Sequence, residues 1–213
     1  MRYKAILFDM DGTLLDTLTD MADAVNHILS VHGWPLRTTE EVRAFVGNGA
    51  RRLMERAVPP EVTGGDFEAV LTEYRDWYQA HNCVATAPYP GIPALLAALA
   101  EAGVKTAVVS NKPDATTKTL AARFFPGLPA FGQRDDVPPK PAPDLVFRAL
   151  ETLGVDAAGA VYVGDSEVDV ATARNAGLPL AAVSWGFRGR RALAEAGASV
   201  IVDTAAELLE VLR

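Results

Sequence analysis

The stretch Ala5-Ile6-Leu7-Phe8-Asp9-Met10-Asp11-Gly12-Thr13 joins a short apolar run to two aspartates and a glycine. The apolar run predicts a buried strand, and Asp9 and Asp11, two residues apart at its end, can point to the same side. Two like charges about 4 Å apart repel by about 1 kcal/mol in water and by about 4 kcal/mol at an effective dielectric of 20. A fold keeps such a pair where a cation, a proton or bulk water offsets the repulsion. The stretch therefore predicts a metal site or an acid–base site.

Most of the remaining chain alternates short apolar runs with helical patterns. The predicted strands cover residues 4–8, 105–109, 160–163, 180–183 and 199–202. The predicted helices cover residues 92–102, 113–124, 143–153, 167–176 and 204–212. Near-continuous apolar strands separated by helices indicate a parallel sheet covered on both faces. We therefore expect an α/β fold with a Rossmann-like parallel sheet, in which ligands bind beyond the carboxyl ends of the strands.

Residues 18–82 break this alternation, because they show helical patterns and no convincing strand. Thr17 or Thr19 can cap a helix that runs toward His32, and Thr38-x-x-Glu41 is typical of a capping box. The segments 14–17 and 84–89 are the expected linkers. We therefore expect residues 1–16 and 84–213 to form the α/β catalytic core and residues 17–83 to form a small all-helical insert.

The composition excludes several classes of protein. The 213 residues include 20 lysines and arginines against 27 aspartates and glutamates, a net charge of −7, with no basic run longer than two. A surface for nucleic acid or for an anionic membrane is therefore not expected. Cys83 is the only cysteine, which excludes an internal disulfide and suits a reducing compartment. Apolar runs fall short of the roughly 18 residues that a spanning helix needs. We expect a cytoplasmic protein.

Polar side chains gather where the predicted strands end. Ser110-Asn111-Lys112 follows one strand, Gly164-Asp165-Ser166-Glu167-Val168-Asp169 follows another, and Lys140 lies in a proline-rich loop ahead of a helix. Taken singly, each has a simpler reading: Ser110 and Asn111 as helix caps, Asp165 and Asp169 as cap and surface residues, and Lys140 as a solvated side chain. Helix capping does not explain why a hydroxyl, a lysine and four carboxylates are expected at the same edge of the sheet. Their joint arrangement therefore favours a chemical site.

This set of side chains suits phosphoryl transfer. Magnesium prefers hard oxygen ligands and is commonly held by one or two carboxylates with water and substrate phosphate. A lysine, a hydroxyl and backbone amides can neutralise phosphate oxygens. A free carboxylate can attack phosphorus and form an aspartyl-phosphate. Since phosphoryl transfer depends mainly on positioning and charge neutralisation, we expect a phosphate-processing enzyme.

The same residues resemble the four motifs of the haloacid dehalogenase superfamily, in the family's order and over nearly the whole chain. The matching motifs are Asp9-x-Asp11-Gly12-Thr13-Leu14-x-Asp16, Ser110-Asn111-Lys112, Lys140-Pro141 and Gly164-Asp165-Ser166-x-x-Asp169. The helical insert, residues 17–83, is similar to the small cap of this family. Shorter stretches resemble bacterial phosphoglycolate phosphatases, namely residues 45–50, 109–113 and 184–187.

The resemblance implies a role for each motif residue. Asp9 would be the nucleophile and a magnesium ligand, and Asp11 would be the general acid and base, with its backbone carbonyl on the metal. Ser110 and Lys140 would hold the phosphate, with the backbone of Asn111 nearby, and Lys140 would also act in catalysis. Asp165 would be a direct metal ligand and Asp169 either a ligand or a support behind the ligands. An aspartate rather than a threonine at position 11 favours phosphatases and mutases over ATPase-like relatives.

The insert is where substrate choice is expected. Gly49 and Arg51, beside Gly47, Asn48 and Arg52, offer backbone amides and cations that could hold a small carboxylate. A helix break followed by two solvent-facing arginines explains the same residues equally well. We expect the three histidines of the insert to serve packing or helix ends rather than catalysis.

The leading hypothesis is a magnesium-dependent phosphatase, with 2-phosphoglycolate as the expected substrate, a small phosphorylated metabolite as its only expected partner, and a monomer or homodimer as its form. A phosphosugar mutase or a pyrophosphatase of the same superfamily remains open. From other classes, a receiver-like phosphate-binding domain is disfavoured because receivers are shorter and lack the insert. A non-catalytic interaction protein is disfavoured because unused clustered carboxylates would only destabilise the fold.

Overall fold

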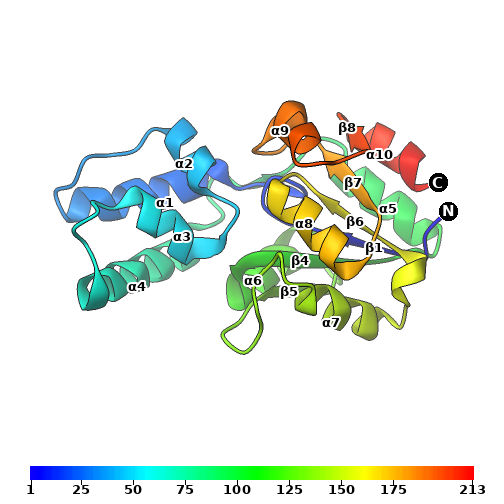
Figure 1. Cartoon of the computed structure of the whole chain (residues 1–213), viewed down its shortest axis with the longest axis horizontal. Helices are drawn as coiled ribbons and strands as arrows, with labels where there is room; N and C mark the ends of the chain where they lie inside the picture. The colour runs from blue at the N-terminus through cyan, green and yellow to red at the C-terminus, as the bar shows by residue number, and fades with distance from the viewer. The chain divides into compact units, whose positions relative to one another are not determined.

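The computed structural model describes all 213 residues, and they form two compact units. Met1–Asp16 with Pro88–Arg213 make the first unit, and Thr17–Ala87 make the second. Where the chain leaves and re-enters the first unit, β2 (Leu15–Asp16) and β3 (Ala87–Pro88) pair as a two-stranded sheet (Figure 1). None of the helices combines the length and the apolar character that a membrane span requires.

The first unit is built on a six-stranded parallel sheet in the order β5-β4-β1-β6-β7-β8. The strands are β1 (Ala5–Phe8), β4 (Lys105–Pro113), β5 (Ala130–Gln133), β6 (Ala160–Gly164), β7 (Leu180–Val183) and β8 (Ile201–Val202). β1 lies inside the sheet, with Phe8 level with Val108 of β4 and with Val163 of β6. The predicted α/β fold with a parallel sheet is confirmed.

Helices cover both faces of this sheet. They are α5 (Ile92–Glu101), α6 (Asp114–Phe124), α7 (Asp144–Leu153), α8 (Glu167–Ala176), α9 (Gly189–Glu195) and α10 (Ala205–Leu212), with a 3₁₀ turn at Ala157–Gly159. Ala5 and Leu7 share one buried cluster with apolar residues of α7 and α8. Because side chains alternate along a strand, Ile6 and Phe8 face the opposite side, where α5 and α10 contact each other and the sheet (Figure 1). Burial on both faces explains why β1 is apolar without interruption.

The strand β5 and the helix α9 were not expected, and β4 extends well beyond its predicted end. β5 contains a glycine and is half-buried at the sheet edge, and α9 begins in a glycine- and arginine-rich segment, so neither shows a clear apolar period. β4 was expected to end at Val109, but it continues to Pro113 with a register irregularity after Val109. The strand prediction was wrong here because Ser110, Asn111 and Lys112 are buried polar residues that remain in the strand.

The second unit consists of four helices, as its pattern predicts. They are α1 (Leu18–Val31), α2 (Thr39–Phe45), α3 (Gly49–Ala57) and α4 (Gly64–His81). The capping box of Thr38 and Glu41 is present. Thr17 precedes α1, but its side chain makes no capping hydrogen bond, so that part of the prediction was wrong. His27 and His81 both stack on Trp77, with centroids 4.6 and 4.0 Å away, which is the packing role expected of them.

A buried aspartate, Asp20, joins the start of the second unit to its end. The Asp20 carboxylate, 2% exposed, accepts the backbone N–H groups of Val84, Ala85 and Thr86 at 3.0, 2.8 and 2.9 Å. It therefore ties the first turn of α1 to the segment that follows α4. The sequence gives no hint of this contact, since Asp20 reads as an ordinary acidic residue in the first turn of a helix.

We expect Asp20→Asn to lower the free energy of unfolding by about 3 kcal/mol, because an amide offers only one acceptor oxygen and turns a donor toward buried N–H groups. Urea unfolding of the full chain measures this change. The matched control is Asp23→Asn, an exposed site on the same helix, which should be nearly neutral. Equal unfolding midpoints for Asp20→Asn and the wild type would show that these three hydrogen bonds do not stabilise the fold.

Candidate active site

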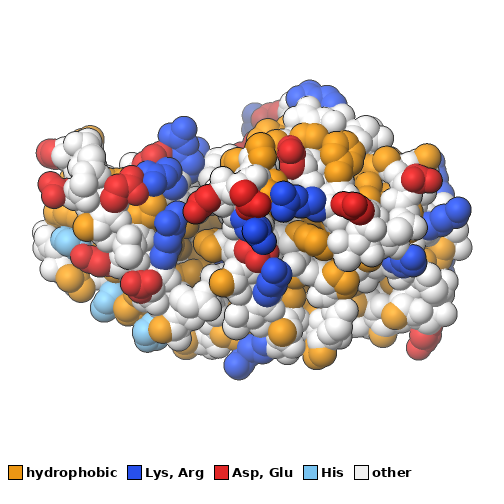
Figure 2. Space-filling model, turned by 90° about the horizontal axis from the view of Figure 1, so that it is seen from below, with side chains coloured by type: hydrophobic (Ala, Val, Ile, Leu, Met, Phe, Trp, Pro, Cys, Tyr) orange, Lys and Arg blue, Asp and Glu red, His pale blue; other side chains and the backbone are white.

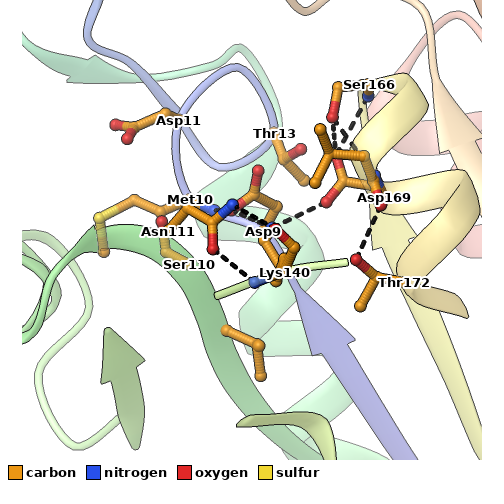
Figure 3. Close-up of polar contacts among 12 residues, drawn as sticks. Asp9, Met10, Asp11, Thr13, Ser110, Asn111, Lys140, Ser166, Asp169 and Thr172 are labelled. Carbon is orange, nitrogen blue, oxygen red and sulfur yellow. Dashed lines mark hydrogen bonds and ion pairs between the residues drawn. The ribbon is translucent and has the colours of Figure 1, made fainter. Parts of the chain in front are cut away.

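Polar residues from three adjacent strands meet at the carboxyl edge of the sheet (Figure 3). Asp9 follows β1, Ser110 lies in β4, and Asp165 follows β6. The Asp9 backbone N–H still donates to the Val163 oxygen at 2.9 Å, which extends the ladder between β1 and β6 to Asp9. Lys140 reaches the same place from the loop between β5 and α7. The sheet topology therefore gathers residues that are far apart in sequence.

Lys140 is the centre of this cluster. Its ammonium nitrogen lies 3.0 Å from Asp9 Oδ1, 2.8 Å from Asp169 Oδ1 and 3.0 Å from the Tyr162 hydroxyl. An ammonium group has three hydrogens, so these three oxygens take all of them. Lys140 would contact a phosphate only by releasing one of these partners.

The Asp9 carboxylate has one oxygen in use and one available. Oδ1 accepts the Met10 backbone N–H at 2.7 Å and the Lys140 ammonium at 3.0 Å. Oδ2 takes part in no hydrogen bond or ion pair with the chain. A carboxylate held through one oxygen presents the other in a fixed direction, which is what nucleophilic attack needs.

Asp165 and Asp169 are buried and held by different partners. Asp165 accepts the Thr13 hydroxyl at 3.1 Å and the Phe187 backbone N–H at 2.7 Å. Asp169 uses Oδ1 for Lys140 and Oδ2 for the Ser166 backbone N–H and hydroxyl, at 3.1 and 2.6 Å. Each Asp165 oxygen accepts one hydrogen bond, whereas Asp169 holds the Lys140 ammonium on Oδ1 and two donors on Oδ2, so Asp165 keeps more lone-pair capacity for a cation and Asp169 suits support behind it.

Two glycines leave room for these carboxylates. Gly12 has φ +82°, and a Cβ there would meet the Asp165 carboxylate. A Cβ at Gly164 would meet the Asp169 side chain. The Asp11-Gly12 and Gly164-Asp165 pairs are therefore steric requirements of the site as well as turn signals.

Burial sets the electrostatics of the cluster. Loss of hydration raises the pKa of Asp9 to about 7, with the neighbouring Asp169 and Asp11 adding to the rise and Lys140 opposing it. Burial raises the pKa of Asp165 well above its usual value, and Asp169 and Asp9 raise it further. Burial lowers the pKa of Lys140, but Asp169 and Asp9 outweigh this and hold it well above its usual value. One lysine therefore does not neutralise the carboxylates around it.

The donor set fits a divalent cation. Asp9, Asp165 and Asp169 are all buried, and one carboxylate oxygen from each lies within 4.8 Å of the others. Hard oxygen donors and surplus negative charge are what Mg²⁺ requires. Asp9 and Asp165 are the residues that would hold the ion, with Asp169 behind them. A bound Mg²⁺ would supply charge neutralisation for phosphate oxygens.

Asp11 lies in the same loop, with its side chain turned away from the cluster (Figure 3). Its Oδ2 is 3.1 Å from the Lys112 ammonium, which is buried. The sequence pattern predicts no role for Lys112, since the strand was expected to end at Val109 and only the structure buries Lys112 in β4. Ser110 is buried, and its hydroxyl accepts the Lys112 backbone N–H at 3.2 Å.

Asn111 contributes its side chain to the protein itself. Its amide nitrogen donates to the Lys140 carbonyl at 3.0 Å, and its carbonyl accepts the Lys140 backbone N–H at 2.7 Å. Sequence reasoning expected only its backbone beside the phosphate. The contact crosses from β4 to a loop 29 residues later, so no local pattern announces it.

Gly49 and Arg51 belong to the second unit. Gly49 begins α3, and the Arg51 guanidinium makes two hydrogen bonds of 2.8 Å to the Glu68 carboxylate. An anion bound by Arg51 would compete with Glu68. The proposed carboxylate recognition by these residues stays a prediction.

A parallel α/β sheet with buried carboxylates and a lysine at its carboxyl edge suits the binding of a cation and a phosphate, as a phosphate-handling enzyme requires. The family of haloacid dehalogenase-like hydrolases matches residues 6–183, and the chain belongs to this family. The family predicted from the four motifs is thus confirmed.

Two relatives and one solved structure are similar to this chain over nearly its whole length. The chain is 36% identical to the N-acetylmuramic acid 6-phosphate phosphatase of Pseudomonas aeruginosa, across 100% of this chain and 96% of that protein. It is 34% identical to the phosphoglycolate phosphatase of Pseudomonas savastanoi pv. phaseolicola, across 97% of this chain and 78% of that protein. A crystal structure from Lactobacillus delbrueckii subsp. bulgaricus, of a candidate phosphoglycolate phosphatase, superimposes with a TM-score of 0.94 at 38% identity, covering 100% and 99% of the two chains. The predicted enzyme class, a phosphoric monoester hydrolase, is confirmed.

Proposed function

We propose that the chain is a Mg²⁺-dependent phosphatase that hydrolyses a small phosphate monoester through a phosphorylated Asp9. The observation that carries the proposal is the Asp9 carboxylate, held by Lys140 through Oδ1 with Oδ2 available. We place the reaction in the cytoplasm, carried out by a monomer or homodimer.

In the proposed reaction, Asp9 Oδ2 attacks phosphorus while the bond from phosphorus to the ester oxygen breaks. Asp11 donates a proton to that leaving oxygen once its side chain turns from Lys112 toward the ester. In the second step the Asp11 carboxylate takes a proton from water, and the resulting hydroxide attacks phosphorus. Asp9 leaves as the carboxylate with release of inorganic phosphate. Ser110 and the backbone amide of Asn111 hold the phosphate oxygens.

Two substrates have support. The phosphoglycolate phosphatases at 34–37% identity favour 2-phosphoglycolate. The N-acetylmuramic acid 6-phosphate phosphatase favours that sugar phosphate, since the match spans 96% of its length. We propose 2-phosphoglycolate first and the sugar phosphate as the second candidate. We further propose that the helical unit, Thr17–Ala87, is the cap that makes this choice.

Release of phosphate from a panel of esters, with and without Mg²⁺, tests the proposal. The panel contains 2-phosphoglycolate, N-acetylmuramic acid 6-phosphate, hexose phosphates and pyrophosphate. We expect kcat/KM to be highest for one of the first two and turnover to stop with a chelator. Isomerised hexose phosphate without phosphate release would instead indicate a mutase. No hydrolysis of any ester with Mg²⁺ would overturn the proposal.

We expect Asp11→Asn to lower kcat roughly 10²–10⁴-fold, because the amide can neither donate nor accept the proton. Nitrophenolate leaves without protonation, so p-nitrophenyl phosphate should still give a burst of one nitrophenol per enzyme followed by slow turnover. Mg²⁺ binding should survive, since the proposed metal contact of Asp11 is its backbone carbonyl. Rapid mixing measures the burst, and full steady-state activity would show that Asp11 has another role.

A further inference from the structure

Lys140 is held at both ends by side chains that have no part in the reaction proposed above. Its backbone N–H and carbonyl bind the Asn111 carboxamide, at 2.7 and 3.0 Å. Its ammonium binds the Tyr162 hydroxyl at 3.0 Å as well as the two carboxylates. Asn111 comes from β4 and Tyr162 from β6, the two strands that flank β1. The long, flexible lysine is thereby attached to both neighbours of the strand that carries Asp9.

Tyr162 is built to hold an ammonium in one direction. It is fully buried in the apolar cluster under α7 and α8, which packs around its ring. Its hydroxyl has one hydrogen, and the Val109 carbonyl at 3.1 Å is closer to it than Asp169 Oδ1 at 3.4 Å. With that hydrogen given to Val109, the hydroxyl lone pairs face Lys140.

The position of the Lys140 ammonium determines which oxygen of Asp9 it binds. Two of the three ammonium hydrogens are fixed by Tyr162 and Asp169, so the third is directed at Asp9 Oδ1. Holding Oδ1 leaves Oδ2 to attack phosphorus. We infer that Tyr162 and the side chain of Asn111 are positioning residues, which fix the Lys140 ammonium on one oxygen of the nucleophile. The inference rests on the proposed function.

Tyr162→Phe is the sharpest test, because it removes the hydroxyl and leaves the buried ring. We expect kcat for the best ester of the panel to fall roughly 10- to 100-fold, as expected for a misplaced catalytic group, with KM within about threefold of the wild type. Asn111→Ala removes the other attachment and should give the same pattern. It keeps the inference testable if one of the two variants does not fold.

The control is Val146→Ala, which removes buried volume from the same apolar cluster in α7 without touching the site. Its unfolding midpoint should fall while kcat stays at the wild-type value. A purely structural role for Tyr162 predicts the same behaviour for Tyr162→Phe, and that result would overturn the inference.

A double-mutant cycle with Lys140→Met supplies a second criterion. If Tyr162 and Asn111 act through Lys140, Tyr162→Phe and Asn111→Ala should change kcat less than about twofold in the Lys140→Met background. Undiminished effects in that background would overturn the inference. If the wild-type enzyme hydrolyses none of the esters, the proposed function itself is overturned. If the wild type is active and both variants keep full activity, only the positioning role is overturned.

Discussion

Asp9→Asn should reduce phosphate release by roughly 10⁴-fold or more, because an amide oxygen cannot form the acyl-phosphate. The substitution preserves the size of the side chain and the acceptor for the Met10 N–H, so the fold should persist. Steady-state phosphate release, with circular dichroism to confirm folding, checks both statements. Activity within tenfold of the wild type would exclude Asp9 as the nucleophile.

When metal is absent, the same variant should gain stability relative to the wild type as the pH rises. The pKa of Asp9 rises from 3.8 to about 7 on folding, so the folded state holds the proton more tightly than the unfolded state. Its contribution to stability is therefore complete below pH 3.8 and is lost as the pH rises through about 7. Asparagine does not titrate.

Urea unfolding in the presence of a chelator, at pH 4.5 and at pH 8, measures this effect. The difference in unfolding free energy between Asp9→Asn and the wild type should shift in favour of the variant at pH 8. A difference that is the same at both pH values would show that the carboxylate is not strained by its surroundings.

Lys140→Met is expected to be the most damaging substitution for the fold and the site together. Methionine fills the same channel but leaves the buried carboxylates of Asp9 and Asp169 without their cation. Breaking a buried pair in this way costs about 3–5 kcal/mol. Turnover should fall roughly 10²–10³-fold, because the direction of Asp9 is lost. Urea unfolding and phosphate release measure the two effects.

A second substitution separates stability from catalysis. Asp169→Asn in the Lys140→Met background removes one unpaired charge while keeping the hydrogen bond from Ser166 to Oδ2 within reach. The double variant should regain part of the lost stability and none of the lost turnover. Recovery of turnover would mean that Lys140 serves only to neutralise charge.

The arrangement of the main elements could be predicted because it depends on local pattern. β1 is apolar over its whole length and ends in Asp9, and the rule that ligands bind at the carboxyl edge of a parallel sheet brings Asp165 and Lys140 near it. The edge strand β5 was not predicted, because it is only half-buried and contains Gly132, so it lacks a run of apolar residues. A Cβ at Gly132 would meet the Asp114 backbone, so the residue that weakens the pattern is required by packing.

The contacts inside the site could not be predicted, because they depend on which atoms face each other across strands. Tyr162 reads as one more apolar residue of β6, and only the register of β6 beside β1 places its hydroxyl by Lys140. Asn111 reads as a helix cap or a backbone contact, yet its side chain binds a loop. The hydrogen bonds of Asp20 likewise join residues 64 to 66 positions apart in the sequence, so no local pattern predicts them.

The most direct measurement is chemical capture of the enzyme during turnover. Acid quenching in the steady state, followed by borohydride reduction, converts an aspartyl-phosphate to homoserine, which peptide mass spectrometry can locate. Homoserine at position 9 in the wild type, with none in Asp9→Asn, is the predicted result. Phosphate release with no modified residue, or with the modification at another aspartate, would contradict the account.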